Sequence, residues 1–284
     1  MQVKRIVHAI HVVRDLGRTR QRYMNALGAW VFAESYHEGE DRDMNLMYVA
    51  NFMVEPMSPR GKPTGLTRFL ERYGEGLHSI EFEVDDLSAA KAALTARGIR
   101  STDVHGSFFF AHPKDTFGVL LEVTTARMPN DPFHYEGWNP RWSMGHPSSI
   151  LGVASLNFVV EDLDGARRML TDVWGGVVLK EAALPGPEPI DVCHLAIADG
   201  VVCLARPQTR TGPIGRWLAE RGPGFYSVTW RVESRDAAEA FCIDRGLSVL
   251  TEGTLSGGVS IDPSDFFGAR HEFAEGSVWG AAPD

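Results

Sequence analysis

Residues 68–79 read Arg68-Phe-Leu-Glu-Arg-Tyr-Gly-Glu-Gly-Leu-His-Ser79, and a similar stretch returns as Arg216-Trp-Leu-Ala-Glu-Arg-Gly-Pro-Gly-Phe-Tyr-Ser227. Both copies predict an amphipathic helix, a Gly-x-Gly exit and the entry to a strand. Two more pairs of segments recur in the same order, namely Val12–Leu16 with Val159–Leu163 and Pro113–Gly118 with Pro263–Gly268. A self-match at an offset near half the chain length predicts an internal duplication.

Each half contains a shorter repeat of its own: an alternating strand, an acidic turn, a short helix, a glycine and a new strand. It occurs four times, at His8–Gly28, Ser79–Gly98, Ser155–Gly175 and Ser227–Gly246. In the second copy the alternate residues Ile80, Phe82 and Val84 form one apolar face, which we expect to meet the helix. Further strands are expected at Asn45–Val54, Phe108–Ala111, Val119–Thr124 and Val192–Ala205. The unit is therefore βαβββ.

The predicted fold class is α+β, with four βαβββ modules paired into two domains. Strands with one partly polar face favour cupped mixed sheets that enclose a cavity for a small molecule. We expect an N-terminal domain at residues 1–126, a connector at 127–149 and a C-terminal domain at 150–284. The connector lacks periodicity, and its aromatic residues indicate that it packs on the domains. These are Phe133, Tyr135, Trp138 and Trp142.

The composition excludes several classes of partner. The 284 residues carry a formal net charge of -9, which repels phosphate backbones, so nucleic acid is not expected to bind. The N-terminus has no signal-peptide pattern and no apolar stretch is long enough to span a bilayer, so no membrane insertion is expected. Three cysteines without CxxC spacing favour reduced thiols and a cytoplasmic location. Four modules complete both cups in one chain, so we expect a monomer or homodimer.

Two stretches of the N-terminal half resemble the vicinal oxygen chelate superfamily, which includes glyoxalase I, methylmalonyl-CoA epimerase, extradiol dioxygenases and bleomycin-binding proteins. They are Gly76-Leu-His-Ser-Ile-Glu-Phe-Glu-Val-Asp-Asp-Leu87 and Phe110-Ala-His-Pro-Lys-Asp-Thr-Phe-Gly-Val-Leu-Leu-Glu-Val123, and they are most similar to epimerase and glyoxalase sequences. The resemblance extends over nearly the whole chain and implies the paired-module fold. It does not fix the activity, because this fold hosts lyases, isomerases, oxygenases and metal-free binders.

The resemblance also implies a metal site in the N-terminal half. Metal-binding members place histidines on the first strand of each module of a domain and a glutamate on its last strand, which gives His8, His78 and Glu122 as ligands of a divalent ion (Zn, Mn, Co, Ni or Fe). Ser79 holds the expected histidine position, so His78 reaches the cavity only if a β-bulge shifts the register. Phe52, near the place of a fourth ligand in some relatives, cannot coordinate.

The residues themselves point to two catalytic candidates, Glu81 and Glu122. A carboxylate inside the apolar run Val119–Val123 is costly to bury unless it meets a cation or a proton. Glu81 lies on the predicted cavity face, where a carboxylate can act as a base. In the C-terminal half Ser155 and Ser227 replace the two histidines and only Glu272 remains, so a degenerate metal site is expected there.

Three functions stay open. The leading hypothesis is a metal-assisted isomerase or lyase that transfers a proton next to a carbonyl group of a small-molecule substrate. The second is an extradiol-type ring-cleaving dioxygenase with Fe(II), which is disfavoured because such relatives keep their iron in the C-terminal half. The third is a metal-free protein that binds or sequesters a small molecule.

Overall fold

The computed structural model describes residues 1–102, 105–128, 130–135 and 148–276. The first half runs in the order β1 (Arg5–Val12), α1 (Leu16–Leu27), β2 (Trp30–His37), β3 (Arg42–Val49), β4 (Phe52–Pro59), α2 (Gly65–Tyr73), β5 (Gly76–Glu83), α3 (Leu87–Thr95), β6 (Phe108–Ala111), β7 (Leu121–Thr124) and a short 3-10 helix η1 (Pro132–His134). In the second unit the second strand, which follows α3, is reduced to an isolated bridge between Ser101 and Ala111.

The second half repeats this order. Its elements are β8 (Ile150–Val159), α4 (Leu163–Trp174), β9 (Val177–Leu184), β10 (Ile190–Ile197), β11 (Gly200–Pro207), α5 (Pro213–Arg221), β12 (Gly224–Val232), α6 (Arg235–Ile243), β13 (Val249–Leu250), β14 (Val259–Ile261), the 3-10 helix η3 (Pro263–Phe266) and β15 (Arg270–Glu275).

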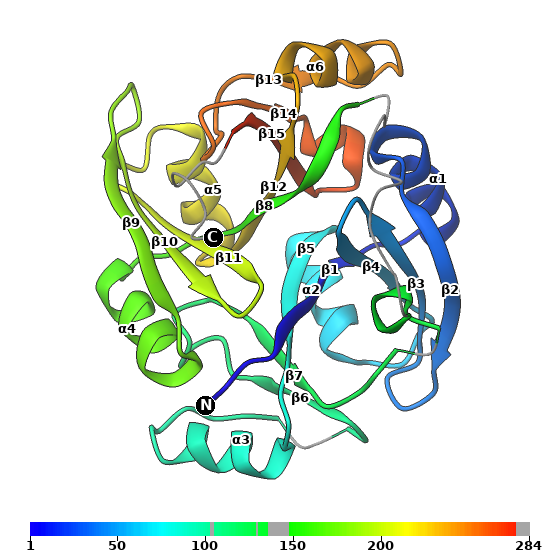
Figure 1. The fold of residues 1–284 in the computed structure, drawn as a ribbon, viewed down its shortest axis with the longest axis vertical. Helices are drawn as coiled ribbons and strands as arrows, with labels where there is room; N and C mark the ends of the chain where they lie inside the picture. The colour runs from blue at the N-terminus through cyan, green and yellow to red at the C-terminus, as the bar shows by residue number, and fades with distance from the viewer. Residues whose placement is uncertain (103–104, 129, 136–147, 277–284) are drawn as a thin grey trace.

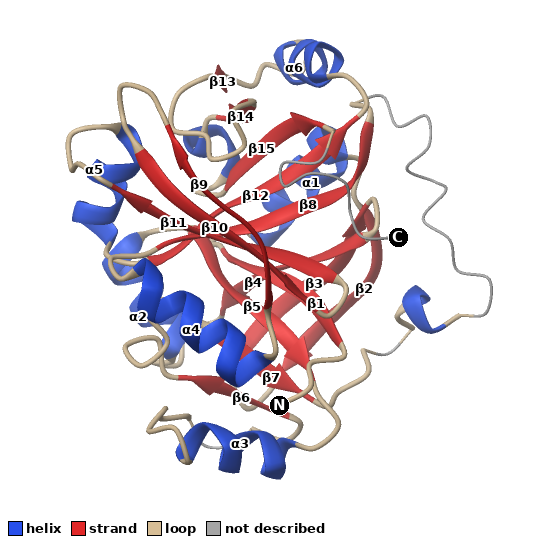
Figure 2. Cartoon of the chain, turned by 60° about the vertical axis from the view of Figure 1, so that its left-hand side comes forward, coloured by secondary structure: helices blue, strands red, loops and turns tan. Residues whose placement is uncertain are grey.

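Each half builds one mixed sheet (Figure 1). The first has seven strands in the order β2-β3-β4-β1-β5-β7-β6, and the second has eight in the order β13-β14-β15-β12-β8-β11-β10-β9. The central pairs β1–β5 and β12–β8 are antiparallel and join the two units of each half. Figure 2 shows the helices around the outside of the strands. The predicted α+β fold with paired modules is therefore confirmed.

The acidic turns of the sequence repeat start the helices. The side chain of Asp15 accepts a hydrogen bond from the backbone N–H of Arg18, and Asp162 does the same for Gly165. These contacts satisfy amide groups that have no partner inside the helix. Both helices end at a glycine in the left-handed region, Gly28 and Gly175, which closes the repeat as the sequence predicts.

Alternation along the strands separates two faces of the first sheet. On one face α1 and α3 pack on the apolar side chains of the main core, which include Ile80 and Phe82 as expected. On the opposite face α2 packs through Leu66 and Leu70 on Ile10. We call this second face the site face, because it carries the polar residues described below.

The sequence predicts one continuous strand at Asn45–Val54 and another at Val192–Ala205. Both predictions are wrong, because each segment contains a hairpin turn between two strands. The turns lie at Ala50 and Ala198, whose φ angles are 51° and 52°. Alanine rarely adopts this conformation, so the sequence carries no turn signal there. The residue after each turn docks on the other half: Asn51 Oδ1 accepts from Val153 N at 2.9 Å, and Asp199 Oδ1 accepts from Ile6 N at 2.8 Å.

The two halves share one hydrophobic core. The ring of Phe82 in the first sheet lies 5.2 Å from that of Trp174 in α4, and Phe52 lies 6.5 Å from Trp230. The boundaries 1–126, 127–149 and 150–284 stay a prediction, and Trp138 and Trp142 of the connector lie outside the described residues.

The described part of the connector packs on the first half, where Asp131 accepts hydrogen bonds from Arg5 and Tyr48. Cys193, Cys203 and Cys242 are buried free thiols. Among the described helices, none is long and apolar enough to cross a membrane.

Candidate metal centre

Four ionisable side chains converge on the site face, where β4, β1, β5 and β7 lie side by side. They are His8, Glu55, Glu81 and Glu122, and between 1% and 3% of each is exposed. Glu81 lies directly opposite Glu122 in the parallel pair β5–β7. Glu55 lies opposite Ile10, the next residue of β1 on the same face as His8. The strand register therefore determines which residues meet.

A bulge in β1 turns His8 toward the carboxylates. In the β1–β5 pair Ile6 lies opposite Phe82 and Ala9 opposite Ile80, so Val7 and His8 together oppose the single residue Glu81. Bulges of this kind re-aim a side chain and are frequent beside active sites. As a result His8 lies between two carboxylates, with Nδ1 3.0 Å from Glu81 Oε2 and Nε2 2.9 Å from Glu55 Oε2.

The group has the features of a site for a cation. His8, Glu81 and Glu122 each offer one ligand atom, and these atoms lie within 4.8 Å of one another. Among the residues that the structure describes, both nitrogens of His8 and Oε2 of Glu81 and Glu122 are buried without a partner in hydrogen-bond geometry. A buried polar atom without a partner costs about 1–3 kcal/mol. One imidazole and several carboxylate oxygens suit a divalent ion, so these residues fit the metal that the fold family implies.

The charges of the group are strongly coupled. Burial disfavours the charged imidazole of His8, but the Glu81 and Glu55 carboxylates outweigh it and raise its pKa to about 9. Burial also acts against ionised Glu55, yet His8 and Arg42 hold its pKa below the ordinary value. For Glu122, burial and the neighbouring Glu81 raise the pKa well above the ordinary value. Without a cation, the site therefore favours protons on His8 and Glu122.

Arg42 adds a buried positive charge to the site. Only 4% of the residue is exposed. Its Nε lies 2.9 Å from Glu40 Oε2, its Nη1 donates to Met57 Sδ at 2.7 Å, and its guanidinium carbon lies 5.7 Å from the centre of the Phe108 ring. Because three carboxylates carry one negative charge more than a divalent cation neutralises, a nearby arginine reduces the remaining charge.

The structure does not place His78 in this group. The β1–β5 pair does contain the register shift expected near His78: Ile10 lies opposite Ser79 and His11 opposite Leu77, so His78 has no partner residue in the pairing. The His78 ring, however, packs 4.9 Å from Phe69, and its Nδ1 lies 2.9 Å from Ser79 Oγ. Burial and then Arg42 lower its pKa to about 3. A ligand role for His78 stays a prediction that these contacts do not support.

The sequence analysis missed Glu55 and Arg42. Glu55 lies in the apolar run from Phe52 to Met57, which is the same signal that singled out Glu122. The hairpin turn before β4 carries no turn signal in the sequence, so the sequence predicts no register for β4 and does not place Glu55 in the site. Phe52, considered near a fourth-ligand position, instead joins the main core.

The equivalent place in the second sheet holds a neutral hydrogen-bond network. Ser155 Oγ donates to Asn157 Oδ1 at 2.7 Å, and Asn157 Nδ2 donates to the hydroxyls of Ser227 and Thr229, each at 2.8 Å. Glu272 accepts from Ser227 Oγ at 2.5 Å and from two backbone N–H groups at 2.9 Å. Protein donors therefore satisfy these polar groups without a cation.

Comparison with known proteins identifies the family. Residues 7–115 match the family model described as Glyoxalase/Bleomycin resistance protein/Dioxygenase superfamily. The ethylmalonyl-CoA/methylmalonyl-CoA epimerase of Cereibacter sphaeroides is 31% identical over 132 residues, which is 43% of this chain and 97% of that protein. Human mitochondrial methylmalonyl-CoA epimerase is 32% identical over 130 residues, which is 43% of this chain and 74% of that protein. The chain therefore belongs to this superfamily, as the sequence resemblance predicted.

Solved structures match both halves together. A mutant of 4-hydroxymandelate synthase from Streptomyces coelicolor superimposes with a TM-score of 0.75 at 16% identity, covering 99% of this chain and 94% of that chain. A 2,3-dioxygenase from a Pseudomonas species superimposes with a TM-score of 0.61 at 15% identity, covering 98% and 93%. At this level of identity the likeness concerns the fold alone.

Proposed function

We propose that the N-terminal half is the active half of a metal-assisted isomerase that moves a proton on the carbon next to a carbonyl group. The main support is the set of three buried ligand atoms of His8, Glu81 and Glu122 within 4.8 Å of one another. The epimerase relatives match 43% of this chain. Their names specify acyl-CoA substrates, so we infer an acyl-CoA thioester as the substrate class.

In this proposal His8, Glu81 and Glu122 hold the ion. A set dominated by carboxylate oxygens suits a hard ion such as Mn²⁺ better than Zn²⁺. When bound, such an ion supplies a positive charge that polarises the carbonyl oxygen of the substrate. Glu55, at 2.9 Å from His8 Nε2, is a positioning residue, because it fixes the ring so that Nδ1 faces Glu81.

We assign proton transfer to Glu81. Without the ion, burial raises the pKa of this carboxyl although His8 acts in the opposite direction, which favours uptake of a proton by Glu81. Apart from the 3.0 Å ion-pair contact with His8 Nδ1, its Oε2 has no hydrogen-bond partner among the described residues, which leaves a lone pair to accept a proton. Burial of the whole group excludes water from the reacting carbon, and it also means that the covering side chains must separate for substrate to enter.

Deuterium exchange tests the proposal directly. Protein loaded with Mn²⁺ is incubated with methylmalonyl-CoA in D₂O, and deuterium uptake at the carbon between the two carbonyl groups is followed by mass spectrometry. We expect exchange with the unaltered protein and none with Glu81→Gln. The glutamine keeps an oxygen that can coordinate the metal, but it cannot accept the proton. Glu55→Gln should retain part of the activity. Absence of exchange with every acyl-CoA thioester and metal tried would contradict the proposal.

Metal analysis separates this function from the two alternatives. Protein purified without chelators should contain manganese or a similar divalent ion. Stoichiometric iron would instead favour the ring-cleaving dioxygenase, and a protein that binds no divalent ion would favour a metal-free binding protein. The dioxygenase structures support only the fold, so they do not raise that alternative above the isomerase.

A further inference from the structure

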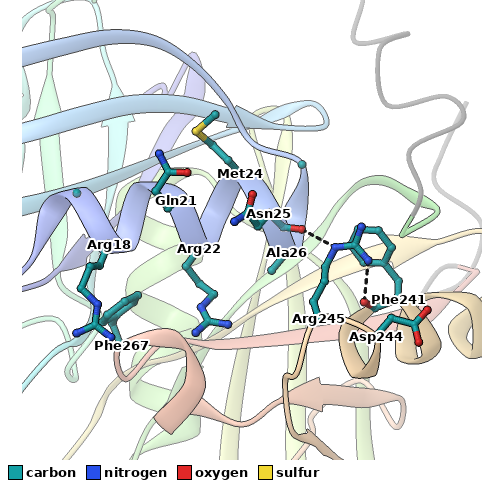
Figure 3. Close-up of a pocket in the computed structure, with 12 residues that line it drawn as sticks. Arg18, Gln21, Arg22, Met24, Asn25, Ala26, Phe241, Asp244, Arg245 and Phe267 are labelled. Carbon is teal, nitrogen blue, oxygen red and sulfur yellow. Dashed lines mark hydrogen bonds between the residues drawn. The ribbon is translucent and has the colours of Figure 1, made fainter.

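A groove at the junction of the two halves lies outside the proposed metal centre (Figure 3). Its volume is about 950 Å³, and α1 lines one side while α6 and the turn at Phe267 line the other. Three arginines, Arg18, Arg22 and Arg245, and one aspartate, Asp244, supply its charged lining. This concentration of positive charge contrasts with the formal net charge of -9 of the whole chain.

Two of the three arginines have unused donors. Arg245 is committed to the protein, since its Nε donates to the Asn25 carbonyl at 2.9 Å. Within the described residues, neither Arg18 nor Arg22 forms a side-chain hydrogen bond or ion pair. The guanidinium of Arg18 lies 5.9 Å from the centre of the Phe267 ring, and Arg22 is close enough to Asp265 to help lower the pKa of that carboxyl, after the stronger effect of the Ser248 N–H.

The second half contains a matched copy of this interface without the two arginines. When Leu16 is aligned with Leu163, Gly165 replaces Arg18 and Met169 replaces Arg22. There Phe117, the counterpart of Phe267, packs so closely that a Cβ at Gly165 would lie 2.4 Å from its ring. Met169 is only 6% exposed. One copy of the interface therefore docks by close packing without arginines, whereas in the other Arg18 and Arg22 lie beside Phe267 and Asp265 of the second half.

The arginines are also poorly placed for helix stability. Like charges four residues apart on one helix face repel each other. Arg18 lies in the first turn of α1, where the helix dipole favours negative charge, and that turn contains no acidic residue. Helix formation does not require these two guanidinium groups, and no hydrogen bond within the described residues uses their donors, so the donors are available to a ligand.

We propose that this groove binds a small molecule that carries a phosphate group. Arg18 and Arg22, one helical turn apart, both donate to phosphate oxygens, for which the guanidinium geometry is well suited. The Phe267 ring, which lies beside Arg18 (Figure 3), provides an apolar surface for an organic portion. A small molecule is favoured over a nucleic acid because the net negative charge of the chain repels a long polyanion.

Calorimetric titration at low salt tests the proposal with two probes, inorganic phosphate and AMP. We expect at least one of them to bind, and tighter binding of AMP would identify an organic phosphate while equal binding would identify free phosphate. Arg22→Gln should weaken binding about tenfold, as the loss of charge-assisted hydrogen bonds predicts. Arg18→Gln should have a similar effect.

Arg20→Gln is the matched control. It removes the same charge from the same helix, but Arg20 pairs with Glu34 outside the groove. This variant should leave the affinity nearly unchanged. Arg22→Met introduces the residue of the second half and is therefore expected to fold, which circular dichroism can check. Failure of both probes to bind, or an equal loss of affinity in the Arg20 and Arg22 variants, would overturn the proposal.

Discussion

Glu122 and Glu272 occupy equivalent positions in the two sheets but have opposite hydrogen-bonding states. Each lies on a strand parallel to the first strand of the second unit, with Glu122 opposite Glu81 and Glu272 opposite Thr229. Glu272 accepts hydrogen bonds from Ser227, Leu255 and Ser256, whereas Oε2 of Glu122 has no hydrogen-bond partner in the described part of the chain. In the second half, protein donors therefore compensate the cost of burying the carboxylate. In the first half, the equivalent carboxylate lacks such donors and is available to a cation.

This difference predicts an asymmetric response to mutation. His8→Ala and Glu122→Ala should each lower the affinity for Mn²⁺ by about 10-fold to 100-fold, because each removes a coordinating atom or its support. Glu272→Ala should leave the affinity unchanged. Titration calorimetry of the three variants provides the measurement, after circular dichroism has confirmed that each is folded. Loss of binding in Glu272→Ala alone would place the centre in the second half.

The same pair predicts opposite effects on stability in the absence of metal. Glu272→Ala leaves the buried N–H of Leu255 and the partly buried N–H of Ser256 without an acceptor and should lower the free energy of unfolding by about 1–3 kcal/mol. Glu122→Gln replaces a carboxyl whose raised pKa favours the neutral form, so the stability of the metal-free protein should hardly change. The increase in melting temperature on adding Mn²⁺ should nevertheless be smaller in Glu122→Gln. Thermal unfolding with and without Mn²⁺ measures both effects.

Much of the fold could be predicted from the sequence because its signals are local and repeated. The strand alternation at Ile80 and Phe82, the capping aspartates and the glycines that end the helices recur in each unit, and each acts within a few residues. The alternation also places Glu81 on the cavity face, while His8 and Glu122 are expected in one site from the family resemblance; the structure brings the three side chains together.

The remaining features depend on contacts between distant segments. The turns at Ala50 and Ala198 adopt a conformation unusual for alanine, and docking of the following residue on the other half helps to hold them. Because the sequence does not indicate the turn at Ala50, it does not predict the register of β4 or the contact between Glu55 and His8. The bulge that turns His8 toward Glu81 likewise depends on pairing between β1 and β5, which local propensity does not encode.

The shared core predicts that the two halves unfold together. Trp174 in α4 is 1% exposed and packs against Phe82 of the first sheet. Trp174→Ala should therefore lower the free energy of unfolding by about 3–5 kcal/mol while the protein still unfolds in a single transition. Met24→Ala, at an exposed position, is the control and should change stability little. Two separate transitions in the unaltered protein, by fluorescence and circular dichroism, would show that the halves are independent.

The contact of His11 with both halves predicts a specific pH dependence of stability. Its Nδ1 lies 3.1 Å from the hydroxyl of Tyr23 and its Nε2 lies 2.8 Å from the carbonyl oxygen of Phe267, and burial lowers its pKa to about 4. An unfolded histidine has a pKa of about 6.5, so between these values the unfolded chain binds a proton that the native protein does not. Stability should therefore fall as the pH decreases from 6.5 to 4, by about 1.4 kcal/mol per pH unit for this group.

Urea unfolding at pH 7 and pH 5 measures the change, and His11→Gln should reduce it by the contribution of one proton. The pKa values of His78, His194 and His271 are lowered as well and these residues remain in the variant; because His11 helps to lower the pKa of His271, the difference between the two proteins measures His11 together with this coupling. Equal pH dependence in both proteins would show that His11 does not couple the interface to pH.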